Sequence, residues 1–190
     1  MFRRLSKAGL SINLDKCEFG RSSLDYLGFT IDASGLRPIE KKIEAIQNFP
    51  KPKKQKDLLG FLGALNYYRS SLPSLPPKDK NSKARTPAEI LDPLYKLATC
   101  DLPKKSSFED VWENSENLKA AFNDAKSLLQ KAITLNFPQP NAPLAITTDA
   151  SKVALGATLD QWVQGSWRPL GMWSKALKGP QQGYSTSVNF

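Results

Sequence analysis

One short motif places a carboxylate where phosphodiester chemistry could use it. The sequence Thr147-Thr148-Asp149-Ala150-Ser151 lies at the end of an apolar stretch, residues 144–148, that predicts a strand. An aspartate there projects a carboxylate from a sheet edge, and two-metal nucleases hold Mg²⁺ with several such oxygens. The same Asp-Ala-Ser sequence is also typical of a turn or a helix cap. Asp149 is therefore a candidate catalytic residue and, alone, a weak candidate Mg²⁺ ligand.

A second candidate site is a concentration of positive charge in the N-terminal half. The chain has 27 Lys and Arg against 18 Asp and Glu, and the segment 37–56 holds seven basic residues but only two acidic ones. After residue 110, seven basic residues face five acidic ones. Such an excess indicates a polyanionic partner, usually nucleic acid, although a solvated basic surface without a ligand is the alternative.

The candidate nucleic-acid-binding residues combine this basic segment with an aromatic cluster. Tyr67-Tyr68-Arg69 could stack on bases or follow a minor groove, and its alternative is core packing for one tyrosine with a surface cation beside it. The candidates are Arg37, Lys41, Lys51, Lys53, Lys54, Lys56, Tyr68 and Arg69.

Absent residue types narrow the chemistry. There is no histidine, which excludes His-based catalysis. Cys17 and Cys100 are far apart and in no metal-ligand spacing, which argues against a zinc site or a disulfide scaffold and favours a reducing compartment. No apolar run reaches the roughly 18 residues of a membrane span, and residues 1–7 lack the apolar stretch of a secretory signal. We expect an intracellular protein, cytoplasmic or nuclear, with no membrane partner.

The N-terminal half predicts strands followed by a helical hairpin. Residues 10–14 and 24–31 alternate in polarity and predict two short strands, and residues 32–35 have the composition of a turn. A helix is predicted from Pro38. A second helix carries apolar residues at helical spacing, and the connection between the two helices is basic. That apolar face consists of Leu58, Phe61, Leu62, Leu65 and Tyr68.

The C-terminal half predicts a linker, helices and then strands. Residues 73–86 hold three Pro and four Lys or Arg, which favours a flexible insertion. Thr86-Pro87-Ala88-Glu89 is a capping box that begins a helix. A clear amphipathic helix carries Phe122 in mid-stripe and predicts that this ring is buried. Three strands are expected over residues 144–148, 154–159 and 167–173, with a tight turn at Gly165.

Motifs along the chain resemble the Pol polyprotein of gypsy-class long-terminal-repeat retrotransposons. Gly9-Leu10-Ser11-Ile12-Asn13, Lys16-Cys17-Glu18-Phe19, Tyr26-Leu27-Gly28-Phe29 and Gly35-Leu36-Arg37-Pro38 are similar to the strand pair after the polymerase palm. Phe61-Leu62-Gly63 and Asn66-Tyr67-Tyr68-Arg69 look like thumb helices. Thr147-Thr148-Asp149-Ala150-Ser151, Trp167-Arg168-Pro169-Leu170 and Tyr184-Ser185-Thr186 resemble the opening of a ribonuclease H domain. The collinear order covers nearly everything outside residues 73–115.

The resemblance implies an RNA-directed DNA polymerase with ribonuclease H, but this sequence lacks residues that both active sites of that family need. The Tyr-x-Asp-Asp turn of the polymerase does not occur, and no acidic residue follows Asp160. Asp149 matches the first nuclease carboxylate, but its expected partners are absent. The intact family enzyme uses Mg²⁺, whereas we expect no tight metal binding here.

These observations predict an α+β fold with a helical thumb-like region, a short strand pair and a partial ribonuclease H-like sheet of three strands. The expected divisions are residues 1–72 for the end of the palm and the thumb, 73–117 for a variable insertion or linker, and 118–190 for the connection helix and a truncated nuclease domain. The expected function is that of a catalytically incomplete polyprotein fragment. It would bind RNA–DNA or DNA duplex weakly and without sequence preference, and its other partner would be the remainder of the polyprotein. A domesticated protein-interaction module without enzymatic activity is the alternative.

Overall fold

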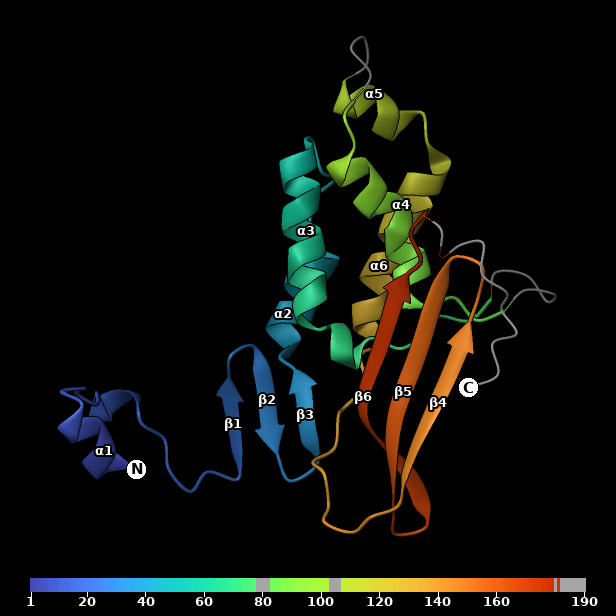
Figure 1. Cartoon of the computed structure of the whole chain (residues 1–190). Coiled ribbons are helices and arrows are strands. Elements are labelled where there is room, and N and C mark those ends of the chain that lie inside the picture. Colours follow the sequence, from blue (N-terminus) through green and yellow to red (C-terminus); the bar gives the residue numbers. More distant parts are fainter. Residues whose placement is uncertain (78–82, 103–106, 180, 182–190) are drawn as a thin grey trace.

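A computed structural model describes residues 1–77, 83–102, 107–179 and 181 (Figure 1). Two three-stranded antiparallel sheets are joined through a group of helices, which confirms the predicted α+β class. In chain order the elements are α1 (Phe2–Lys7), η1 (Leu14–Lys16), β1 (Ser23–Tyr26), β2 (Phe29–Asp32), β3 (Gly35–Pro38), α2 (Glu40–Gln47), α3 (Gln55–Tyr67), η2 (Arg69–Ser71), α4 (Pro87–Thr99), α5 (Phe108–Glu113), α6 (Glu116–Gln130), β4 (Leu144–Ala150), β5 (Ala154–Val163) and β6 (Ser166–Ala176).

The first sheet differs from the predicted strand pair. Residues 24–31 belong to two strands, β1 and β2, because Leu27 (φ 48°) and Gly28 (φ 83°) form a tight turn between them. Left-handed conformations at both central residues are the hairpin geometry that matches the strand twist. The predicted turn at residues 32–35 leads into a third strand, β3, and residues 10–14 form no strand. Alternation alone missed the hairpin because Leu27 is an apolar residue in a turn position.

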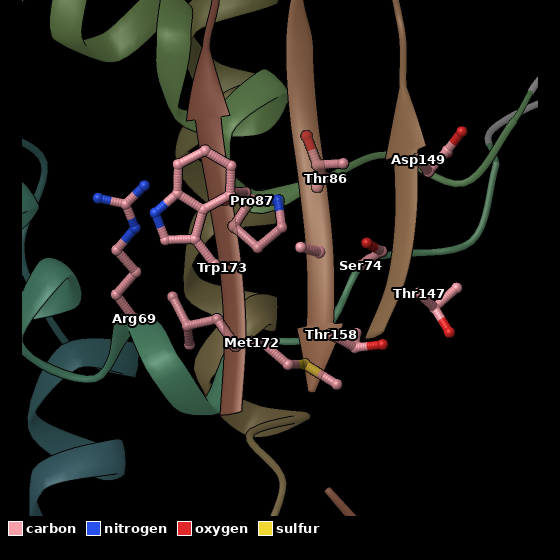
Figure 2. A pocket seen from close by; sticks show the side chains of 13 residues that line it. Arg69, Ser74, Thr86, Pro87, Thr147, Asp149, Thr158, Met172 and Trp173 are labelled. Atoms are coloured by element: carbon pink, nitrogen blue, oxygen red, sulfur yellow. The ribbon is translucent and has the colours of Figure 1, made fainter. Parts of the chain in front are cut away.

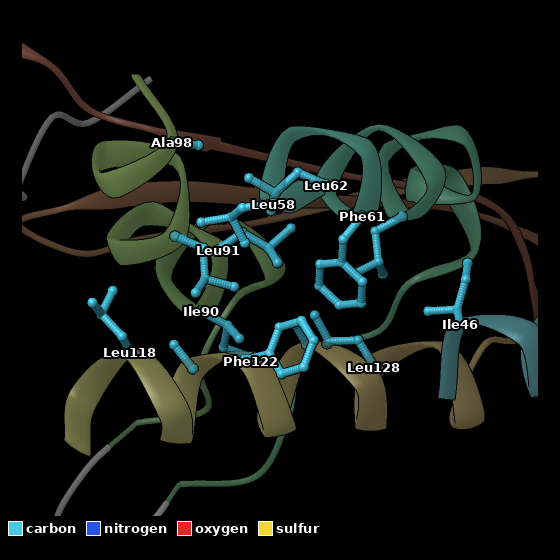
Figure 3. Close-up of a cluster of buried hydrophobic side chains, with 14 of the residues drawn as sticks. Ile46, Leu58, Phe61, Leu62, Ile90, Leu91, Ala98, Leu118, Phe122 and Leu128 are labelled. Carbon is cyan, nitrogen blue, oxygen red and sulfur yellow. The ribbon is translucent and has the colours of Figure 1, made fainter. Parts of the chain in front are cut away.

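Helices α2, α3, α4, α5 and α6 and their connections enclose one apolar core, part of which Figure 3 shows. α3 buries one face, and α6 buries the stripe that contains Phe122. This ring is 6% exposed, which confirms the prediction that it is buried. The Phe122 ring lies 4.5 Å from the Phe61 ring and 5.5 Å from the Trp112 ring, measured between centroids. Among the residues that the structure describes, no helix is both long and apolar enough to cross a membrane.

The segment 73–117 contributes to this core, in contrast to the expected linker. The capping box at Thr86 and Glu89 is present and begins α4. α4 packs against α3, α6 and the second sheet, and it buries Leu94 completely. α5 adds Trp112, which is 3% exposed. The capping box predicted the beginning of α4, but the sequence did not show that α4 and α5 pack into the core.

The second sheet has the order β4-β5-β6, which agrees with the predicted three strands. β5 and β6 are joined by a tight turn at Gln164 (φ 52°) and Gly165 (φ 79°), where the sequence predicted one. The face that carries Gly156 packs against the beginning of α4, because a Cβ at Gly156 would lie 3.2 Å from a methyl group of Thr86. Three tryptophans of this sheet are 42–50% exposed: Trp162, Trp167 and Trp173.

Candidate nucleic-acid interface and nuclease carboxylate

Two of the candidate basic residues already have carboxylate partners. The Nη1 atom of Arg37, on β3, lies 2.5 Å from Oδ2 of Asp32. The Nζ atom of Lys51 pairs with Glu113 of α5 and lies 3.5 Å from Glu109. The Glu113 carboxylate beside Lys51 raises the pKa of the ammonium, and hydrogen bonds from Lys51 and Lys119 lower the pKa of the Glu113 carboxyl. Their charges are therefore partly neutralised within the fold.

Four other lysines carry charge without an acidic partner in the described part of the chain. Lys41 lies in the first turn of α2, Lys53 and Lys54 precede α3, and Lys56 lies in its first turn. All four side chains are exposed, and none of them forms an ion pair among the described residues. Because these ammonium groups are open to solvent, they remain available to an anion.

The backbone that presents these lysines is held firmly. Pro52 is buried, and the amide of Lys53 donates a hydrogen bond of 3.0 Å to the Asp57 carboxylate. The side-chain amide of Gln55 donates to the carbonyls of Leu97 and Cys100 at 2.8 Å each. The connection between α2 and α3 is thus anchored to the fold by its backbone and by Gln55, and its lysine side chains are exposed.

The Tyr-Arg candidates lie at the opposite end of α3. This helix has 13 residues, so its length separates them from Lys54 by about 20 Å. Tyr68 is 4% exposed, its ring centroid lies 5.1 Å from that of Phe29, and its hydroxyl donates to the carbonyl of Gly28 at 3.3 Å. Burial raises the pKa of the Tyr68 phenol. Its ring is enclosed by protein on the side where a base would stack, so its place in this structure is the core.

Asp149 projects from β4 beside a pocket of about 240 Å³ (Figure 2). Its backbone pairs with Gly156 of β5, and the carboxylate is largely exposed, with one oxygen 3.7 Å from Nζ of Lys83. In Figure 2, Asp149 and Thr147 lie at one side of the pocket, and Arg69 and Trp173 lie at the other. The structure therefore places the candidate carboxylate at the edge of a small pocket, facing a lysine.

The donor set around Asp149 does not fit a Mg²⁺ pair. Among the described residues no three His, Cys, Asp or Glu side chains lie close enough to share a metal ion. Glu89 reaches the same end of the sheet, but one of its oxygens accepts from the Thr86 amide at 2.8 Å and the other accepts from the Ser151 hydroxyl at 2.5 Å. Asp160 accepts a hydrogen bond of 3.2 Å from Thr158 inside β5. Mg²⁺ prefers several oxygen ligands and gives up its waters reluctantly, so Asp149 by itself is a poor ligand.

Sequence reasoning missed the partners that residues 83–89 supply to this region. Lys83 faces Asp149, Arg85 pairs with Asp124 of α6 at 2.5 Å, and Glu89 joins α4 to Ser151. The capping box at Thr86 was a visible signal for the position of Glu89. Nothing in the spacing indicated that this helix begins beside β4.

The sequence is similar to curated retrotransposon polyproteins over nearly its whole length. It is 34% identical over 182 residues to the retrovirus-related Pol polyprotein from transposon opus and 32% identical over 184 residues to that from transposon gypsy, both of Drosophila melanogaster. These alignments cover 96% of this chain and 17% and 16% of the two polyproteins. The chain therefore spans about one sixth of the length of these relatives.

Solved structures show the same fold. A foamy viral protease–reverse transcriptase in complex with double-stranded DNA superposes with a TM-score of 0.70 at 22% identity, covering 97% of this chain and 29% of that one. The same viral protein in complex with an RNA/DNA hybrid gives a TM-score of 0.68, also at 22% identity, and covers 97% and 22%. Residues 112–188 match the family described as an RNase H-like domain found in reverse transcriptase. The chain is thus similar to the retrotransposon Pol polyproteins, gypsy among them, over nearly its whole length, and residues 112–188 match the RNase H-like domain found in reverse transcriptase.

Proposed function

We propose that residues 1–190 form a nucleic-acid-holding part of a reverse transcriptase, which binds RNA–DNA or DNA duplex weakly and without sequence preference. The observation that carries the proposal is the anchored connection between α2 and α3, where Lys53, Lys54 and Lys56 form no ion pair with any residue that the structure describes. The foamy viral proteins of the same fold were solved with double-stranded DNA and with RNA/DNA hybrid, which supports the same class of partner.

The contacts would be to phosphates. Lysine is a point charge without the planar fork that reads base edges, so the three ammonium groups suit the sequence-independent part of recognition. Arg37 and Lys51 contribute less, because Asp32 and Glu113 would have to release them first. Each phosphate neutralised on a B-form duplex releases counterions and adds about 0.9 to the slope of log K against log salt.

A salt titration tests this assignment. Labelled RNA–DNA hybrid is titrated with the chain by fluorescence anisotropy between about 50 and 200 mM salt. Replacing Lys53, Lys54 and Lys56 together with Gln should weaken binding and reduce the slope by about 2–3. The matched control replaces three exposed lysines elsewhere that form no ion pair in the described structure: Lys7, Lys131 and Lys152. An equal loss of slope in both variants would mean that net charge, not the α2–α3 connection, determines binding.

We further propose that residues 1–190 do not cleave RNA by themselves. Two-metal hydrolysis needs a cluster of carboxylates that holds both ions about 3.5–4 Å apart. Asp149 has a lysine at 3.7 Å, and its acidic neighbour Glu89 is committed to Thr86 and Ser151. The role of Asp149 within this polypeptide is then a strand residue that lines the pocket, and Mg²⁺ would bind it only weakly.

A protein-interaction module is the second candidate, and one observation favours it. The sheet β4-β5-β6 exposes large apolar side chains, with Ile146 at 72% and Trp173 at 47%. Exposed apolar patches often mark sites of protein contact. Binding of a protein partner that persists in high salt and is lost in the Ile146→Lys variant would favour this candidate over duplex binding.

A further inference from the structure

A second, larger groove lies between the helices and the end of the second sheet. It has a volume of about 510 Å³ and runs along one side of α4, between the end of α3 and the end of β6. Figure 1 shows the end of β6 beside α4, and β6 also contacts η2, which follows α3. Its floor is apolar and includes Leu72 and Leu91, which are 2% and 7% exposed. Ligand sites of small molecules fall in this size range, about 300–1,000 Å³.

Cations surround this apolar floor. Arg69 of η2, Lys175 of β6 and Lys178 line the groove, and none of them forms an ion pair within the described residues. The acidic residue of the lining, Asp92, is held by Lys96 at 2.6 Å. The polar atoms that remain open to a ligand are therefore mainly donors, which suits an anion.

An aromatic side chain forms part of the same lining. Tyr95 of α4 is 37% exposed, so part of its ring is open to the groove. Burial raises the pKa of its phenol, and the nearby charge of Arg69 opposes that rise. Arg69 and Tyr95 line the same groove, so the guanidinium could act on the charge of a ligand and the ring on its apolar face.

We propose that this groove binds a small aromatic anion of the size of a nucleoside monophosphate. The anionic group would meet Arg69 with Lys175 or Lys178, and the flat ring system would lie over Tyr95 and the leucine floor. Arg69 is at the far end of α3 from the lysines assigned to the duplex, so this inference does not rest on the proposed function. A nucleotide and an aromatic carboxylate share the required chemistry.

Calorimetric titration of the whole chain with adenosine 5′-monophosphate tests the site. Adenosine lacks the charge and inorganic phosphate lacks the ring, so these two probes separate the contribution of the charge from that of the ring. 1-Naphthoate carries a ring with a carboxylate, so it distinguishes an aromatic carboxylate from a nucleotide as the ligand. We expect the monophosphate to bind at least about tenfold more tightly than adenosine, which lacks the charge-assisted hydrogen bonds, and than inorganic phosphate, which lacks the ring contact. Comparable affinity for 1-naphthoate would identify an aromatic carboxylate as an equal ligand.

Three variants locate the binding. Arg69→Gln removes the positive charge, so the affinity for the monophosphate should fall about tenfold or more while the affinity for adenosine stays unchanged. Ala88→Phe fills the groove from α4 and leaves its charge unchanged, so it should lower the affinity for both the monophosphate and 1-naphthoate. Lys54→Gln, at the duplex site, should leave both unchanged. Equal affinity for adenosine and its monophosphate, binding unaffected by Arg69→Gln in a chain with an unchanged circular dichroism spectrum, or no saturable binding would each overturn the proposal.

Discussion

Phe122 offers the most direct test of the single helical core. Its ring is 6% exposed and meets the rings of Phe61 and Trp112, while Nζ of Lys126 lies 4.7 Å from its centroid. Truncating a buried phenylalanine to alanine costs about 3–5 kcal/mol, and the two close ring contacts place Phe122 in the upper part of that range. We therefore expect Phe122→Ala to lower the free energy of unfolding by about 4–5 kcal/mol.

The assay is urea denaturation followed by far-ultraviolet circular dichroism, which reports on α3, α4 and α6 together. Phe19→Ala is the matched control, because that ring is 67% exposed and touches only Phe2 among aromatic residues of the described structure, at 6.1 Å. It should cost less than about 1 kcal/mol. A loss below about 1 kcal/mol in Phe122→Ala would show that α6 is peripheral and would refute the packing argument.

The remaining predictions concern the carboxylate, a turn and an ion pair. Neither the chain nor its Asp149→Asn variant should hydrolyse a labelled RNA–DNA hybrid with Mg²⁺ or Mn²⁺, and cleavage lost in the variant would contradict this. Gly35→Ala should unfold the β3 junction, because a Cβ at this residue (φ 134°) would lie 2.1 Å from the carbonyl oxygen of Leu135, and hydrogen exchange at Leu36 would report it. Hydrogen bonds from Ser34 and then Arg37 lower the pKa of Asp32 from 3.8 to about 2. Since the folded pKa lies below the unfolded one, Asp32 stabilises the fold above about pH 3.8, and this contribution disappears as the pH falls towards 2. Urea melts across that range should show this loss of stability in the unchanged chain, and Asp32→Asn should lack this part of the pH dependence.

The helices were predictable because their apolar positions repeat at the helical period. The stripe of α6 and the face of α3 are buried as the spacing required, and the capping box at Thr86 marks the beginning of α4. The strands of the second sheet were also predicted, although each runs beyond the expected range. These elements are local, so a short window of sequence contains their cause.

The parts that could not be predicted depend on residues far apart in the chain. Lys51 is one example, since its partners Glu113 and Glu109 are about sixty residues away and lie in a segment interpreted as a linker. Tyr68 is another, because composition left its two roles open and only the packing against Phe29 decided between them. The exposed tryptophans of β5 and β6 show the same limit, as alternation gives the faces of a strand but not which face is covered.

The position of Asp149 is determined by structural contacts of β4 and α4 that involve no catalytic group. β4 is held in register by β5, and the residue after the strand is Ser151, whose hydroxyl donates to Glu89 of α4. Glu89 also caps its own helix, so one carboxylate joins the beginning of α4 to the end of β4. This junction fixes where position 149 lies, whether or not other carboxylates are near. The resemblance of Asp149 to the first nuclease carboxylate therefore concerns its position on the strand, and a proposal about activity has to be argued from its neighbours, which here are Lys83 and a fully committed Glu89.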